Sequence, residues 1–216
     1  MNKNIIVVFV SLWMLVSVAE MYGTEPRLNR LIEPLRPYVE EVIGQLDGIP
    51  VERKQILDQI GRDIAGRLQS ETGSAWLIYI CTHNSRRSHM AQLWAQTAAC
   101  YYGLDQVNTF SGGTKATACN IRTVSALRRA GFSIVTAEDG DNPVFLIQFS
   151  DERPPMKAYS KIYNQGDNPK DDFIALMCCS EADMSCPIVD GASSRYAIHY
   201  VDPKERDDTD EEVLAY

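Results

Sequence analysis

A cysteine, an arginine and a serine stand at a spacing that suits the binding of a tetrahedral oxyanion. Cys81 and Arg87 are separated by five residues, and Ser88 follows directly. A loop of this length can curl around an anion and point its main-chain N–H groups inward, while the positive end of a following helix strengthens the field. The same field favours an ionised Cys81 thiolate, which is a strong nucleophile. The planar guanidinium of Arg87 suits two oxygens of the anion, and Ser88 can donate a hydrogen bond to the sulfur.

The elements expected around this loop are those of an α/β fold. Residues 76–80 form a short apolar run typical of a buried parallel strand, and apolar residues recur at helical spacing from Met90. Strand, tight loop and helix form the opening unit of such a fold. The alternative is a structural cysteine beside two solvated arginines, although a polar turn is an unusual setting for one. Further strands are expected at 107–110, 173–177 and 196–201, a helix at 120–130, and an inserted hairpin at 144–149 and 156–163.

At these residues the sequence resembles a known superfamily. The loop, the Ser-Gly-Gly turn at 111–113 and the late Asp-Pro at 202–203 resemble the low-molecular-weight tyrosine phosphatase fold. Within that superfamily, the segment 179–188 resembles the thioredoxin-coupled arsenate reductases, and the likeness covers about residues 75–204. The resemblance implies a three-layer α/β fold with a central parallel sheet, preceded here by a helical extension.

The resemblance also implies roles for individual residues. It makes Cys81 the nucleophile, Arg87 the oxyanion-binding arginine and Asp202 the general acid. Cys179 and Cys186 match the two resolving cysteines of the reductases. The residues expected to bind the substrate are Thr82, His83, Asn84, Ser85, Arg86 and Ser88.

Several positions depart from the superfamily pattern. His83 stands where glycine is usual, so the loop is expected to adopt positive φ less freely. Gln92 replaces a carboxylate that helps some reductases hold potassium, so no potassium dependence, no metal and no cofactor are expected. The sequence ends at Tyr216, where the superfamily continues with a closing helix, which leaves the cover of the last sheet face in question.

Three functions fit these residues. The leading hypothesis is arsenate reduction, in which a thioredoxin-like reductant regenerates the cysteines. The alternative is a protein tyrosine phosphatase that works through a phosphocysteine, with a phosphate ester or a phosphotyrosine protein as substrate. In that case Cys179 and Cys186 are structural or form a disulfide. The third is a non-enzymatic anion-binding module in which His83 has spoiled the loop.

The remaining cysteines and histidines carry no chemistry in this interpretation. Free cysteine is often a packing residue. The histidines lack the spacing of zinc ligands, so no metal site is expected. The residues expected to be structural are Cys100, Cys119, Cys178, His89 and His199.

The first 73 residues precede the domain expected at 74–216. Lys3 gives a basic start, and an apolar run from Ile5 to Val18 is followed by a small residue, so 1–23 is predicted to be a secretory signal outside the fold. Residues 24–73 are predicted to form a packing or partner-docking helical hairpin.

Use of this signal would export the protein, for example to the periplasm, whereas a chain without it is expected to be cytoplasmic. Export would weigh against the reductase hypothesis, because the thiol reductants for such a relay are normally cytoplasmic. The formal net charge of -8 argues against nucleic acid as a partner.

Overall fold

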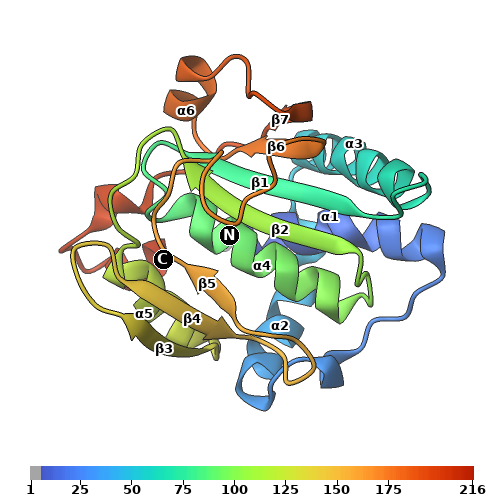
Figure 1. Ribbon diagram of the computed structural model, residues 1–216. Coiled ribbons are helices and arrows are strands. Elements are labelled where there is room, and N and C mark those ends of the chain that lie inside the picture. Colours follow the sequence, from blue (N-terminus) through green and yellow to red (C-terminus); the bar gives the residue numbers. More distant parts are fainter. Residues whose placement is uncertain (1–5) are drawn as a thin grey trace.

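The computed structural model describes residues 6–216, and its centre is a four-stranded parallel sheet (Figure 1). Its strand order is β2-β1-β6-β7. The strands are β1 (Ala75–Cys81), β2 (Val107–Gly113), β6 (Phe173–Met177) and β7 (Ala192–Ala197). All three neighbour pairs are parallel, so the carboxyl ends of the strands lie along one edge, where residues 81, 113 and 178 meet.

The two central strands are apolar because both of their faces are covered. Leu77 to Ile80 of β1 are fully buried, as are all five residues of β6. Such continuous burial is typical of the inner strands of a parallel sheet. The fold is the expected three-layer α/β architecture with a central parallel sheet.

A second, smaller sheet is antiparallel, with the order β3-β4-β5. It contains β3 (Ser133–Glu138), β4 (Val144–Gln148) and β5 (Met156–Ala158). The expected hairpin is confirmed by the pairing of β4 with β5. β3 was not expected, and the last strand of the large sheet begins earlier than the predicted 196–201.

Helices pack against the parallel sheet and one another. α4 (Arg87–Tyr101) packs on β1 and β2, and α3 (Val51–Leu68) lies beside β7. Asp63 of α3 accepts hydrogen bonds from Ser194 (2.5 Å) and Tyr196 (3.2 Å), which join the helical extension to the last strand. The other helices and 3-10 turns are η1 (Leu28–Arg30), η2 (Glu33–Leu35), α2 (Arg36–Ile43), η3 (Leu46–Gly48), α5 (Ile121–Ala130), α6 (Ser180–Ser185), η4 (Pro203–Arg206) and α7 (Glu212–Ala215).

The N-terminal apolar run forms a helix that packs on other helices of the structure, whereas the sequence analysis expected residues 1–23 to be a secretory signal outside the fold, which stays a prediction. α1 (Ile6–Tyr22) packs against both α3 and α4 (Figure 1), and Leu15 and Val18 are fully buried. A Cβ added at Gly61 of α3 would lie 2.9 Å from the Met14 carbonyl oxygen, so the two helices pack closely. Lys3 lies outside the described residues, and export itself stays a prediction.

None of the helices in residues 6–216 is both long and apolar enough to span a bilayer. α1 has apolar residues on all sides; most of those in its middle are buried, whereas Met21 and Tyr22 at its C-terminal end are exposed. α1 lies beside α4, and α1 and α3 provide helical cover for the sheet. The sequence analysis had left the cover of the last sheet face in question.

Candidate active site

The loop after β1 is held from outside through its carbonyl oxygens. In the described chain, the main-chain N–H groups of residues 82–86 have no hydrogen-bonded acceptor. They are therefore free to bind an anion. The carbonyl oxygens of Cys81, Thr82, His83 and Ser85 accept hydrogen bonds from Thr114 N (3.1 Å), Lys115 N (2.8 Å), Ser160 Oγ (2.8 Å) and Asn120 N (2.9 Å).

Asn84 fixes the curl of the loop. Its φ is 44°, in the left-handed region that asparagine tolerates better than most residues. Its Nδ2 donates to Ser88 Oγ (2.9 Å), and its Oδ1 accepts from the main-chain N–H of Lys161 (3.0 Å). The left-handed position therefore falls on Asn84 and not on His83, so the missing glycine does not obstruct the loop.

Cys81 lies at the base of the loop, almost fully buried. Its Sγ lies 3.1 Å from Ser88 Oγ, the contact that the sequence analysis expected. The Ser88 hydroxyl also accepts a hydrogen bond from Asn84, so its own proton is directed toward the sulfur. The Ser88 hydroxyl is therefore placed to donate a hydrogen bond to the Cys81 sulfur.

Arg87 and Asp202 form an ion pair at the mouth of the loop. Arg87 Nη2 lies 2.6 Å from Asp202 Oδ2, and both side chains are partly buried. The other carboxylate oxygen of Asp202 accepts from the main-chain N–H of Lys204 (3.1 Å), which caps η4. The structure thus brings the predicted arginine and the predicted acid together.

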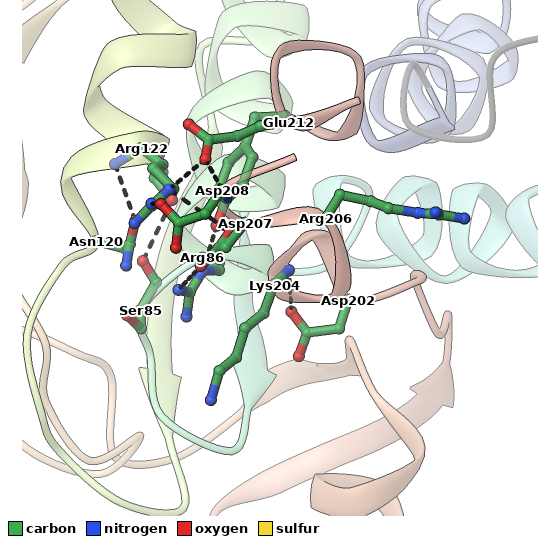
Figure 2. Close-up of polar contacts among 12 residues, drawn as sticks. Ser85, Arg86, Asn120, Arg122, Asp202, Lys204, Arg206, Asp207, Asp208 and Glu212 are labelled. Carbon is green, nitrogen blue, oxygen red and sulfur yellow. Dashed lines mark hydrogen bonds and ion pairs between the residues drawn. The ribbon is translucent and has the colours of Figure 1, made fainter. Parts of the chain in front are cut away.

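The side chain of Arg86, a residue expected to bind the substrate, is held by the C-terminal segment (Figure 2). Its Nη2 lies 2.7 Å from Asp207 Oδ2, and its Nε contacts the Tyr216 hydroxyl. The Tyr216 hydroxyl in turn donates to Asp207 (2.7 Å). Only the main chain of Arg86 is left to line the anion site.

Arg122 of α5 extends this network. It pairs with Asp208 (2.6 Å) and with Glu212 (2.8 Å) (Figure 2). Asp208 and Glu212 of the acidic C-terminal segment are therefore tied to α5. Burial opposes ionisation of Asp207, but the hydrogen bond from Tyr216 and the Arg86 guanidinium lower the pKa of its carboxyl below the usual value. The hydrogen bond from Arg122 lowers the pKa of the Glu212 carboxyl. Figure 2 also shows Arg206 extending away from the cluster.

Cys179 and Cys186 flank the short helix α6 beside the loop. Cys179 follows β6, and its Sγ lies 3.5 Å from the Thr82 hydroxyl. The same hydroxyl donates to Glu181 (3.0 Å), so the first turn of α6 is tied to the loop. Cys186 ends the helix and is partly exposed. All six cysteines are free thiols in this structure.

The other three cysteines are poor nucleophiles. Burial raises the pKa of Cys119 to about 12 and that of Cys100 less, and it raises the pKa of Cys178 well above its ordinary value. His89 is also buried, and its pKa falls to about 3 because of burial and the nearby Lys161 ammonium. These positions agree with the packing and structural roles expected for them.

Sequence reasoning missed the charged residues that surround α6. Asp183 contacts both Arg195 and His199, but the three residues are separated in the sequence and follow no motif. Across residues 6–216, no group of three or more histidine, cysteine or acidic side chains is placed to hold a metal ion.

The chain is similar to arsenate reductases. It is 29% identical over 140 residues to an arsenate reductase of Bacillus licheniformis, which is 65% of this chain and 82% of that protein. It is 27% identical over 139 residues to an arsenate reductase of Halalkalibacterium halodurans, covering 64% and 81%. A Corynebacterium glutamicum thioredoxin-dependent arsenate reductase structure aligns with 83% of this chain and 78% of its own, at 18% identity and a TM-score of 0.33. No family model matches the chain.

Proposed function

We propose that this protein is an enzyme that reduces arsenate with a Cys81 nucleophile and a thiol–disulfide relay through Cys179 and Cys186. The observation that carries the proposal is the position of Cys179. Its sulfur contacts Thr82 of the anion loop, and Cys186 stands at the far end of the adjoining helix. A phosphatase needs neither cysteine, whereas a reductase must supply two electrons from thiols.

Substrate binding would begin with an exchange of partners at Arg87. The free N–H groups of residues 82–86 and the guanidinium of Arg87 would surround the arsenate oxygens. Arg87 now pairs with Asp202, so the oxyanion would compete for the same guanidinium. The carboxyl group of Asp202 would then be available to carry a proton to the leaving group.

The reduction balances in three steps. The Cys81 thiolate attacks arsenic, and Asp202 protonates the departing hydroxyl, which leaves as water. Cys179 then attacks the Cys81 sulfur. The sulfur–arsenic bond breaks with its electron pair on arsenic, arsenite leaves, and a Cys81–Cys179 disulfide remains. Cys186 next attacks Cys179, which releases the Cys81 thiolate and leaves a Cys179–Cys186 disulfide for an external dithiol to reduce.

The surroundings of Cys186 support a role for an external reductant. Met184 and Ile188, on either side of it in the sequence, are 75% and 77% exposed. Exposed apolar side chains next to a partly exposed sulfur suit contact with another protein, so we expect a thioredoxin-like dithiol to reach the Cys179–Cys186 disulfide here.

The test compares two substrates. The wild type is expected to reduce arsenate with dithiothreitol or a thioredoxin system. Cys179→Ser is expected to abolish that turnover and spare hydrolysis of p-nitrophenyl phosphate, because ester hydrolysis needs only Cys81, Arg87 and Asp202. Cys100→Ser, at a buried cysteine at the opposite end of α4 from the loop, is the matched control and should retain both activities. Ester hydrolysis without any arsenate turnover in the wild type would overturn the proposal in favour of the phosphatase alternative.

A further inference from the structure

The helix between the two relay cysteines is too short to be stable by itself. α6 has six residues, with Cys179 at its N-cap and Cys186 at its C-cap. Isolated helices shorter than about 12 residues are marginal in water. The contacts that α6 makes with its neighbours must therefore decide whether it stays helical.

Arg195 of β7 holds the C-terminal end of α6. Its Nη2 donates to the main-chain oxygen of Asp183 (2.8 Å) and to that of Cys186 (3.2 Å), and it also pairs with the Asp183 carboxylate. The last carbonyl groups of a helix lack partners within the helix, and a cation there is favoured by the helix dipole. The guanidinium of Arg195 thus caps the C-terminal end of α6 and also binds the Asp183 side chain.

His199 completes this group of contacts, which we call the α6 clasp (Asp183, Arg195 and His199). Its Nε2 lies 2.9 Å from Asp183 Oδ2, the oxygen that Arg195 leaves free. Both carboxylate oxygens of Asp183 are thereby held by side chains of β7 and the segment that follows it. All three side chains are partly buried, with 22–41% of their surface exposed, so solvent screens the charges only in part.

The clasp opposes the disulfide that the relay requires. A helix rises about 1.5 Å per residue, so residues seven apart lie roughly 10 Å from each other along its axis. A disulfide needs Cα atoms within about 7 Å. Cys186 must therefore move toward Cys179, and this movement breaks the bond between Arg195 and the Cys186 carbonyl oxygen.

We propose that Arg195 and Asp183 are positioning residues that set the unwinding equilibrium of α6, and thereby how readily Cys179 and Cys186 form a disulfide. The inference rests on the proposed relay. The clasp keeps the two thiols apart until Cys179 has been oxidised by Cys81, and it opposes premature closure of the pair. Removal of the clasp favours the unwound segment, because the clasp contacts stabilise only the helical state of α6.

The experiment equilibrates the purified full-length chain, carrying Cys81→Ser, with reduced and oxidised glutathione. The pair gives two protons and two electrons to oxidised glutathione, which yields one intramolecular disulfide and two reduced glutathione molecules. Alkylation and mass spectrometry then measure the disulfide fraction. Asp183→Asn and Arg195→Gln are each expected to move the midpoint about tenfold toward the disulfide, as loss of a charge-assisted contact typically does.

A double variant and a control separate the clasp from general destabilisation. The double variant, Asp183→Asn with Arg195→Gln, should shift the midpoint by less than the sum of the two single changes, because both remove the ion pair between Asp183 and Arg195. Arg206→Gln removes a surface arginine that pairs with Glu211 and should leave the midpoint unchanged. Hydrogen exchange at the Cys186 amide, which donates to Ala182, should accelerate in the clasp variants only.

A midpoint within threefold of the parent in both single variants, or equal shifts in Arg206→Gln, would overturn the inference. Asp183→Asn preserves the shape of the side chain, so its result stands even if Arg195→Gln fails to fold. The assay contains no arsenate. If the clasp variants shift the midpoint but the wild-type chain does not reduce arsenate, the result contradicts the proposed function alone. If the wild-type chain reduces arsenate but the clasp variants leave the midpoint unmoved, the result contradicts the clasp alone.

Discussion

Replacement of Leu15 by alanine tests whether α1 is a structural helix. The Leu15 side chain is fully buried, in a helix packed against α3 and α4. Truncation of such a leucine removes favourable burial and leaves a cavity, which lowers the free energy of unfolding by about 3 kcal/mol. For a chain of this size, that corresponds to a fall in Tm of roughly 6–12 °C.

The assay is urea unfolding of the full chain, with residues 1–23 present, and tryptophan fluorescence reports the unfolding transition. Met21→Ala, on the same helix but 51% exposed, is the matched control and should change stability by less than about 0.5 kcal/mol. Leu57→Ala in α3, also fully buried, is the positive control. If Leu57→Ala destabilised the protein and Leu15→Ala did not, then α1 would contribute nothing to the fold and our account of its packing would be refuted.

Three further predictions concern the loop and its surroundings. Asp202→Asn should lower arsenate turnover by roughly 10²–10⁴ at neutral pH, as loss of a general acid does. An unchanged steady-state rate would remove Asp202 from the mechanism. Arg87→Lys should fail nearly as badly as Arg87→Ala, because an ammonium cannot form two parallel hydrogen bonds to the oxyanion. Full recovery of KM for arsenate in the lysine variant would contradict bidentate binding. His89 binds a proton below about pH 3 when folded and near pH 6.5 when unfolded, so the unfolded state gains the proton first as pH falls. Its contribution should make the protein about 2 kcal/mol less stable at pH 5 than at pH 7.5 by urea unfolding, and His89→Gln should abolish this part of the pH dependence. His83→Gln, at an exposed position, should retain it.

The catalytic half of the sheet was predictable because its signals are local. An apolar strand, a polar loop and a helix follow one another directly, and the predicted Ser88–Cys81 contact lies within this one unit. β3 gave no such signal because its residues are mostly exposed and show no alternation. β7 is partly polar, since Ser194 and Tyr196 face Asp63 of α3, and a polar strand is not recognised from hydrophobicity.

The parts of the site that the sequence did not indicate depend on contacts between distant residues. The attachment of Arg86 to Asp207 joins positions 121 apart in the sequence, and nothing in either segment indicates the other. The packing of α1 was not predicted for a different reason. A secretory signal and a buried helix are both rich in apolar residues, so the sequence alone does not indicate the close contact of α1 with Gly61.

The place of α1 at the start of the sequence affects how the molecule is made. Its partners α3 and α4 are translated later, and α4 ends only at Tyr101. During synthesis the N-terminal helix therefore emerges from the ribosome with its apolar surface uncovered, and it stays so until about eighty more residues have followed. Until then the side chains of α1 that pack against α4 have no partner from that helix, and completion of α4 supplies it.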